Sequence, residues 1–316
     1  MNYDHRLEFG AFVTPDARSP ADTVKLAVLT EELGYDLLTF QDHPYQPGFL
    51  DTWTLLGWVA GATERIRLAA NVHSLPLRSP AVLARSAASL DLLTGGRVEL
   101  GIGAGAFWDA IEAMGGRRLS PGAAVDALSE AIEVIRALWD TSRRVVRHQG
   151  EHYPLPAAQP GPDPAHEIPI WVGALKPRML RLVGEKADGW SVTLSGIGTD
   201  GLREGNRRID DAARAAGRDP REVRRLLNVA GRFTAHREGL LVGTPADWVA
   251  DLLPLVTEHG VGTLVLASDD PATLRRYAEE VVPDLRAAVD RATPHGSAGI
   301  RVRKAAALAL RRPGID

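Results

Sequence analysis

Residues 66–105, IRLAANVHSLPLRSPAVLARSAASLDLLTGGRVELGIGAG, indicate the fold of the whole chain. The apolar run Ile66–Val72 has the length of a strand, and Ser79-Pro80 is typical of a helix start. Apolar residues recur behind Pro80 at helical spacing until Gly95-Gly96, a natural helix stop. A second strand, Arg97–Ile102, follows at once, so this stretch predicts a strand–helix–strand unit.

The same alternation of short apolar runs and longer helical segments continues along the rest of the chain. Most runs are apolar on successive residues, which is typical of parallel strands covered on both faces. The expected strands are Leu7–Val13, Tyr35–Phe40, Ile66–Val72, Arg97–Ile102, Ile168–Gly173, Gly189–Leu194, Leu226–Phe233 and Thr263–Ala267. The expected helix starts are Ser19-Pro20, Ser79-Pro80, Ser120-Pro121, Asp219-Pro220, Thr244-Pro245 and Asp270-Pro271. Eight strands in this order favour an α/β fold closed into a (β/α)8 TIM barrel over an open sheet.

Two segments depart from this pattern. We expect one barrel domain over residues 1–292, with an insertion at about 140–167 between strands four and five. The insertion contains several arginines and prolines, and we expect it to contribute to substrate specificity. Residues 293–316 form a basic C-terminal tail, for which a solvated tail and a partner-binding helix are both open interpretations.

The composition excludes several classes of function. The chain of 316 residues has 37 Lys and Arg against 40 Asp and Glu, a net charge of −3, so no global field attracts nucleic acid. It has no cysteine, which excludes disulfides, thiolate zinc sites, iron–sulfur clusters and a Cys nucleophile. No run approaches the ~20 apolar residues of a membrane span, and Met1–Glu8 lacks a signal-peptide core. We therefore expect a cytoplasmic protein without nucleic-acid or membrane partners.

Polar residues follow the second and third expected strands. In a TIM barrel, catalytic and binding residues lie at the C-terminal ends of the strands. Gln41-Asp42-His43-Pro44 places a carboxylate beside an imidazole, and this carboxylate can fix the tautomer of His43 or hold it protonated. The pair suits an acid, a base or a donor to a cofactor ring. The alternative is that Asp42 caps a turn and His43 packs under a loop. Asn71-Val72-His73-Ser74 ends the third strand with polar groups. In isolation this motif is more typical of an ordinary loop entry than of a functional site.

Small residues follow the fourth and fifth expected strands. Gly101–Gly105 allows backbone amides to approach a phosphate or a ring, but its spacing differs from the Rossmann fingerprint. Tight packing at the barrel rim is the alternative. After the fifth strand, Gly173 and Ala174 precede a helix start with Lys176 and Arg178 nearby, which predicts a phosphate cradle.

A metal centre and a serine nucleophile are the competing chemistries. The 9 histidines are scattered, without a His-x-His or His-Glu-x-x-His pair, so we expect no metal site. No Gly-x-Ser-x-Gly elbow occurs, which argues against an activated serine.

In combination, these stretches resemble the luciferase-like oxidoreductases, a family of (β/α)8 barrels that includes bacterial luciferase and uses a flavin or a deazaflavin. The resemblance runs from about Leu7 to about Asp290. The stretches that carry it are Ile66–Val72, the helix from Ser79-Pro80 through Leu90–Arg97, Leu100–Gly105, Pro169–Ala174 and Lys186–Trp190.

The resemblance implies a cofactor site at the mouth of the barrel. Asp42 and His43 are implied to be the catalytic pair against the tricyclic ring, with His43 near its reactive edge. The peptide joining Asn71 and Val72 is where the family often has a non-proline cis bond below the ring. The cofactor-binding residues that the resemblance implies are Asp42, Ala70, Asn71, Val72, Gly103, Ala104, Gly105 and Trp108, with Gly173 and Ala174 at the phosphate. Asp109 stands where relatives often present a polar side chain.

The resemblance implies that the cofactor is either the deazaflavin coenzyme F-420 (F420) or FMN. An Asp-His pair after the second strand is typical of deazaflavin-using members, whereas many FMN-using members have Glu-His. A deazaflavin implies hydride transfer with a small organic substrate, and a reduced flavin implies its oxygenation as in a monooxygenase. A separate reductase or dehydrogenase is implied to supply the reduced cofactor, and members are commonly homodimers. The alternatives are a non-catalytic flavin-binding barrel and a metal-dependent barrel hydrolase or isomerase.

Overall fold

A closed sheet of parallel strands forms the centre of the computed structural model, which describes residues 3–292. Its strands are β1 (Glu8–Val13), β2 (Leu37–Phe40), β3 (Arg67–Ala70), β4 (His73–Ser74), β5 (Leu100–Gly103), β8 (Ile170–Gly173), β9 (Gly189–Thr193), β10 (Arg224–Val229) and β13 (Thr263–Ala267). They lie in the order β3-β2-β1-β13-β10-β9-β8-β5-β4, with parallel neighbours throughout. A parallel bridge between Leu68 and Val98 joins the two ends of the sheet. The predicted barrel is therefore confirmed.

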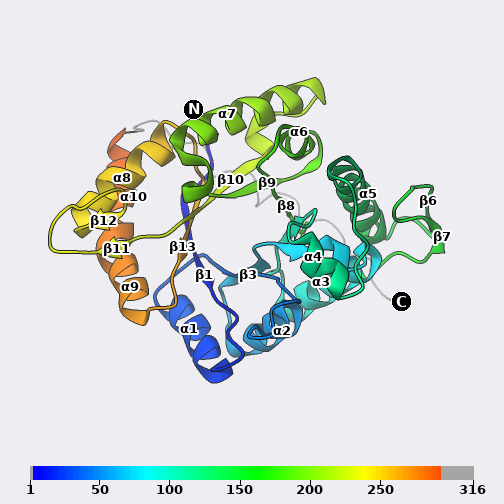
Figure 1. Ribbon diagram of the computed structural model, residues 1–316, viewed down its shortest axis with the longest axis horizontal. Helices are drawn as coiled ribbons and strands as arrows, with labels where there is room; N and C mark the ends of the chain where they lie inside the picture. The colour runs from blue at the N-terminus through cyan, green and yellow to red at the C-terminus, as the bar shows by residue number, and fades with distance from the viewer. Residues whose placement is uncertain (1–2, 293–316) are drawn as a thin grey trace, which may run out of the picture.

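Helices surround the barrel (Figure 1) because each connection between parallel strands crosses over the outside of the sheet. They are α1 (Pro20–Glu32), α2 (Thr52–Ala62), α3 (Pro80–Thr94), α4 (Trp108–Ala113), α5 (Pro121–Trp139), α6 (Pro177–Lys186), α7 (Leu194–Ala215), α8 (Pro245–Thr257), α9 (Pro271–Arg276) and α10 (Val282–Ala292). Short 3₁₀ turns form at η1 (Leu75–Leu77) and η2 (Pro220–Glu222), and the π-helical segment η3 (Tyr277–Val281) joins α9 to α10. The helix predicted at Asp219-Pro220 is wrong: only the turn η2 forms, because β10 begins two residues later at Arg224.

Two expected strands differ from the prediction. The run Ile66–Val72 is interrupted, since β3 ends at Ala70, the Asn71–Val72 peptide bond is cis, and β4 then pairs with β5. The expected cis bond is thus confirmed. In the expected strand Leu226–Phe233, β10 ends at Val229, and β11 (Arg232–Phe233) pairs with β12 (Val242–Gly243) in a separate two-stranded sheet. Between β10 and β11 the chain packs closely, because a Cβ on Gly231 would lie 2.1 Å from the carbonyl oxygen of Leu241.

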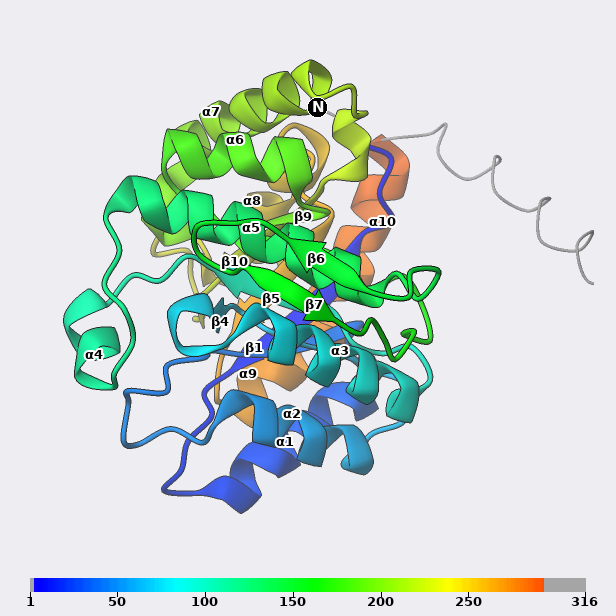
Figure 2. The ribbon, with the colours of Figure 1, turned by 90° about the vertical axis from the view of Figure 1, so that its right-hand side faces the viewer.

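The expected insertion lies between β5 and β8, which are the fourth and fifth strands of the barrel. It contains an antiparallel hairpin, β6 (Val146–His148) and β7 (Leu155–Ala158), which lies beside α5 (Figures 1 and 2). Glu130 of α5 accepts hydrogen bonds from the backbone amides of Glu151, His152 and Tyr153 at 3.0, 2.9 and 3.0 Å. These bonds attach the hairpin turn to the barrel. The predicted tail, 293–316, lies outside the described residues.

The barrel interior is charged at one end and apolar in the middle. At the N-terminal ends of the strands, Arg67 pairs with Glu8 and Glu99, and Arg224 lies 3.1 Å from Glu8. Burial raises the pKa of Glu99 to about 7, and Arg67 opposes this rise. The next layer is an apolar cluster, separate from the core under the helices, made of Leu37, Ala69, Trp171, Leu226 and Val265 with Phe12. The C-terminal end of the barrel is therefore left for a functional site.

Candidate active site

Polar side chains meet inside the barrel at the C-terminal ends of its strands. Asn71 Nδ2 donates to Asn228 Oδ1 at 2.7 Å, and Ser191 Oγ donates to Asn71 Oδ1 at 2.9 Å. Because β3 and β10 are not neighbours in the sheet, the bond between Asn71 and Asn228 spans the barrel interior. Sequence reasoning identified Asn71 but missed Ser191 and Asn228. Their inward positions in β9 and β10, two residues along from Gly189 and Leu226, are the signal that would have found them.

Val72, which follows the cis bond, packs against glycines of two neighbouring strands. A Cβ on Gly103 would lie 2.7 Å from Val72 Cγ2, and a Cβ on Gly173 would lie 3.1 Å from the same atom. A Cβ on Gly101 would lie 2.1 Å from the carbonyl oxygen of Ala70. Close packing at the rim therefore explains these glycines, independently of any ligand that their backbone contacts.

Asp42 is buried, and residues that follow the third strand surround its carboxylate. Arg78 donates to it through Nε and Nη2 at 2.7 Å each, Ser74 donates its backbone amide at 3.0 Å, and His73 Nδ1 lies 3.3 Å away. Burial alone would raise the pKa of Asp42, but the hydrogen bonds and charge of Arg78 and His73 hold it well below its usual range. The expectation that Asp42 fixes the tautomer of His43 is therefore wrong.

His43 instead lies half-buried among aromatic side chains. Its Nδ1 is 2.5 Å from the hydroxyl oxygen of Tyr45, and its Nε2 has no hydrogen-bond partner within residues 3–292. The rings of Tyr45, Phe49 and Phe107 lie 5.3, 6.4 and 5.5 Å from that of His43, centroid to centroid. Burial lowers the pKa of His43, and Asp42 opposes this effect. A neutral imidazole with one free nitrogen is thus presented at the end of β2.

These aromatic residues were not identified from the sequence. Tyr45 stands two residues after His43, and this proximity was an available signal. Phe107 comes from the loop between β5 and α4 and is 58% exposed, so its approach to His43 depends on the closed barrel. In Figure 2, α4 projects from the body of the molecule beside this loop.

The segment after β8 differs in part from the predicted phosphate cradle. Ala174 is buried, and its carbonyl oxygen accepts a hydrogen bond from Trp190 Nε1 at 2.8 Å. Arg178 turns toward α5 and pairs with Asp126 at 2.9 Å. Lys176 is exposed and has no ion pair in the described part of the chain. Lys176 is therefore the cation that is free to meet a phosphate here.

The helix after β5 carries Trp108 at its first position and Asp109 at its second. Asp109 is exposed and forms an ion pair with Arg118, which also lies 2.9 Å from Glu112. The carboxylate that the resemblance suggested for the cofactor is therefore paired within its own loop.

The residues at the mouth of the barrel fit a planar redox cofactor. The hydroxyl of Ser74 is buried and has no hydrogen-bond partner among the described residues. The side chains that end the strands here are small or polar, including those of Asn71, Ser191 and Asn228. A polar ring edge would find donors and acceptors at this level, above the apolar layer of the interior.

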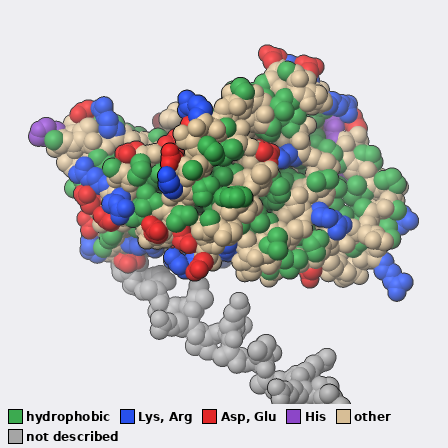
Figure 3. Space-filling model, turned by 90° about the horizontal axis from the view of Figure 1, so that it is seen from below, with side chains coloured by type: hydrophobic (Ala, Val, Ile, Leu, Met, Phe, Trp, Pro, Cys, Tyr) green, Lys and Arg blue, Asp and Glu red, His purple; other side chains and the backbone are tan. Residues whose placement is uncertain are grey.

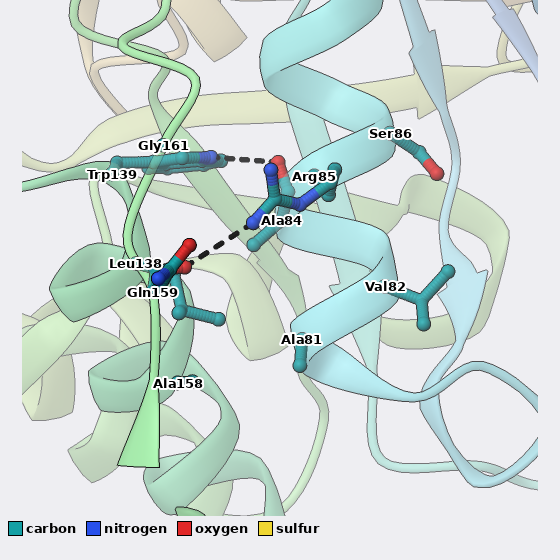
Figure 4. Close-up of a pocket in the computed structure, with 10 residues that line it drawn as sticks. All are labelled: Ala81, Val82, Ala84, Arg85, Ser86, Leu138, Trp139, Ala158, Gln159 and Gly161. Atoms are coloured by element: carbon teal, nitrogen blue, oxygen red, sulfur yellow. Dashed lines mark hydrogen bonds between the residues drawn. The ribbon is translucent and has the colours of Figure 1, made fainter. Parts of the chain in front are cut away.

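A cavity of about 510 Å³ lies outside the barrel between α3 and the insertion (Figure 4). Two hydrogen bonds cross it: Trp139 Nε1 donates to the carbonyl oxygen of Ala84 at 2.8 Å, and Arg85 donates to that of Gln159 at 3.2 Å. No residue at the end of a barrel strand lines this cavity. This cavity is therefore separate from the candidate site at the barrel mouth.

Two properties of residues 3–292 bear on the alternatives. None of the helices found there has both the length and the apolar character needed to cross a bilayer. Within the same residues, no group of three or more His, Asp or Glu side chains is arranged to hold a metal ion.

Comparison with known proteins identifies the class of this barrel. Residues 5–239 match the family described as luciferase-like monooxygenase. The F420-dependent glucose-6-phosphate dehydrogenase of Nakamurella multipartita is 30% identical over 286 residues, which cover 87% of this chain and 80% of the relative. The chain therefore belongs to the luciferase-like family, as the resemblance implied. It is an oxidoreductase whose cofactor is F420 or FMN.

Solved structures show the same fold. An F420-dependent secondary alcohol dehydrogenase, in complex with an F420–acetone adduct, matches with a TM-score of 0.79 at 19% identity, covering 89% of this chain and 99% of that one. The oxygenating constituent of 3,6-diketocamphane monooxygenase from Pseudomonas putida, in complex with FMN, matches with a TM-score of 0.72 at 21% identity, with coverages of 89% and 99%.

Proposed function

We propose that this protein transfers hydride between F420 and the carbon of an alcohol–carbonyl pair in a small organic substrate. The observation that carries the proposal is His43, a neutral imidazole at the barrel mouth with a free Nε2 beside apolar rings. Two of the compared proteins support F420 and this substrate class, since they are named as F420-dependent dehydrogenases of a sugar phosphate and of secondary alcohols. The Asp42-His43 pair also favours F420, because an Asp-His pair after the second strand is typical of deazaflavin-using members of the family.

The cofactor ring is proposed to lie across the mouth, above the polar group of Asn71, Ser191 and Asn228. When bound, the cofactor supplies the carbon that accepts or donates the hydride. The residues proposed to border the ring and its chain are Asp42, His43, Ala70, Asn71, Val72, Gly103, Ala104, Gly105 and Trp108, with Gly173 and Ala174 near the phosphate. The free cation Lys176 adds a favourable charge at that end.

His43 is proposed to move the proton of the reaction. We propose the tautomer in which Nδ1–H donates to the hydroxyl oxygen of Tyr45, which lies 2.5 Å away, because this tautomer leaves the lone pair of Nε2 to accept from the substrate hydroxyl. During alcohol oxidation, Nε2 accepts the hydroxyl proton as hydride leaves the carbon. During carbonyl reduction, the protonated ring returns that proton to the oxygen. Phe49 and Phe107 lie against the same ring and limit the access of water to it.

Cofactor titration tests this proposal. We expect F420 to bind the purified protein with micromolar affinity and FMN to bind much more weakly, measured by the change in cofactor fluorescence. Tight binding of FMN alone, together with oxygen consumption, would replace the proposal with a flavin monooxygenase. Binding of neither cofactor would remove it altogether.

The proposed reaction implies a cellular context. In the direction of carbonyl reduction, a separate reductase or dehydrogenase must supply the reduced cofactor. Because that cofactor is shared between enzymes, we infer that both operate in the cytoplasm.

We also propose that the protein is a homodimer. Helices α2 and α3 carry exposed apolar side chains, with Trp58 71%, Val82 65% and Leu93 84% exposed. Hydrophobic side chains gather on this side of the molecule in Figure 3. Apolar groups concentrated in this way are typical of protein–protein contacts.

Replacing Trp58 with glutamate is expected to convert this dimer into a monomer, because burying an unpaired carboxylate in an apolar contact is unfavourable. Sedimentation velocity measures the change. Leu240→Glu is the matched control, since Leu240 is 56% exposed in the loop between β11 and β12. A wild-type monomer, or a dimer that survives Trp58→Glu, contradicts the proposed interface.

A further inference from the structure

A second cavity, of about 420 Å³, is built from three segments that are far apart in the sequence. They are Leu75–Ser79 after β4, Met114 to Arg117 with Leu119 after α4, and the hairpin turn with His152 and Tyr153. Leucines from the first two segments form apolar walls, and no acidic side chain lines the cavity. An organic molecule with a negative group fits this combination of apolar walls and basic side chains.

The polar side chains of this cavity include hydrogen-bond donors that bind no acceptor within residues 3–292. Arg117 forms no ion pair within residues 3–292. The His152 ring and the Tyr153 hydroxyl have no hydrogen-bond partner in that range. Arg78 also lines the cavity, but Asp42 and Asp51 already balance its charge, each at 2.7 Å. Arg117 is thus the cation of this cavity whose charge is not balanced, and the His152 ring and the Tyr153 hydroxyl line the same space.

The cavity wall is held in place before any ligand binds. The carboxylate of Glu130 accepts the backbone amides of His152 and Tyr153, and a Cβ on Gly150 would lie 2.1 Å from its Oε2. The hairpin turn therefore fits closely around Glu130. A turn fixed in this way loses little conformational freedom when its side chains bind a ligand.

The cavity adjoins the proposed reaction site. Pro76, in its wall, would lie 2.7 Å from a Cβ on Gly105, which belongs to the stretch proposed to border the ring. Arg78, two residues further on, binds Asp42, the neighbour of His43. Pro76 and Arg78 thus connect the cavity wall to residues of the proposed reaction site.

We propose that this cavity binds a phosphate or carboxylate group carried by an organic ligand, with Arg117, His152 and Tyr153 donating to its oxygens. The leucines of the wall contact the carbon atoms next to that group. The group belongs either to the substrate or to the anionic arm of the cofactor. The site gives the insertion between β5 and β8 a role in recognition, and its link to the reaction rests on the proposed function.

Titration calorimetry with pyrophosphate as the probe tests the site without turnover, so failure of the proposed reaction leaves this test intact. We expect Arg117→Gln to bind pyrophosphate at least about tenfold more weakly than the wild type, as for loss of a hydrogen bond to a charged group. Tyr153→Phe should weaken it by less. Arg118→Gln is the matched control, because Arg118 pairs with Asp109 and Glu112 and does not line the cavity. Equal weakening in both arginine variants, or no pyrophosphate binding to the wild type, would overturn the proposal.

A second titration in saturating F420 distinguishes the two sources of the negative group. If the arm of the cofactor occupies the cavity, pyrophosphate binding that depends on Arg117 disappears when F420 is present. If the substrate occupies it, pyrophosphate binds beside F420 with unchanged affinity. Either result supports the cavity as a site for anions, provided that Arg117→Gln weakens pyrophosphate binding in the absence of F420.

Discussion

Replacing His43 with alanine is expected to reduce turnover by about 10²- to 10⁴-fold, the range typical of losing a general acid or base. The affinity for F420 should change far less, because the residues proposed to contact the ring at the barrel mouth come from several strands. His43 has no ionic partner that the change would leave unpaired, since its Nδ1 contacts only the neutral hydroxyl of Tyr45. The folded structure is therefore expected to persist. Steady-state kinetics and cofactor fluorescence together measure this separation of turnover from binding.

Three further measurements make the test of His43 specific. Alcohol oxidation by the wild type should rise with pH through a pKa below 6.5 and then level off, because burial lowers the pKa of His43 and its neutral form is the base. Tyr45→Phe should cost about 3- to 10-fold in turnover, the value of one hydrogen bond. His236→Ala, at an exposed position, should change nothing. Turnover that survives in His43→Ala would remove His43 from the reaction.

Much of the fold could be predicted because its signals are local. The apolar runs of the strands and the helix stop at Gly95, which has a φ of 68°, depend on neighbouring residues only. Asp219-Pro220 carries the same local signal as the other helix starts, yet the chain must enter β10 at Arg224. Beyond the end of β10 at Val229, β11 pairs with β12, and Gly231 packs closely against Leu241, ten residues away. Tertiary packing overrides the local pattern at these points.

The candidate site was only partly predictable, for the same physical reason. The position of His43 after a strand is a local feature, and the closed barrel places it at the mouth as expected. The partner of Asp42 is not local, because Arg78 lies 36 residues along the chain and reaches Asp42 only when the second and third strands are side by side. The contact of Phe107 with His43 also arises only in the closed barrel. Adjacency in sequence therefore suggested the wrong partner for Asp42.

Asp42→Ala is expected to lower the free energy of unfolding by about 3 kcal/mol, because it leaves the guanidinium of Arg78 without its main partner in a mostly buried position. The side chains of Asp42 and Arg78 are 1% and 17% exposed, so water replaces the lost contact poorly. The melting temperature should fall by about 6 °C or more. Thermal unfolding followed by circular dichroism measures this change.

Two other variants separate a structural role of Asp42 from a catalytic one. Asp51 also binds Arg78, but its side chain is 46% exposed, so Asp51→Ala should cost only about 1 kcal/mol. In the double variant Asp42→Ala/Arg78→Ala, the loss of stability should be smaller than the sum of the single losses, because removing both partners leaves no buried charge unpaired. A variant Asp42→Ala that melts like the wild type but has lost turnover would show that Asp42 acts on the cofactor or on His43 directly. The network with Arg78 and His73 would then be secondary to that action.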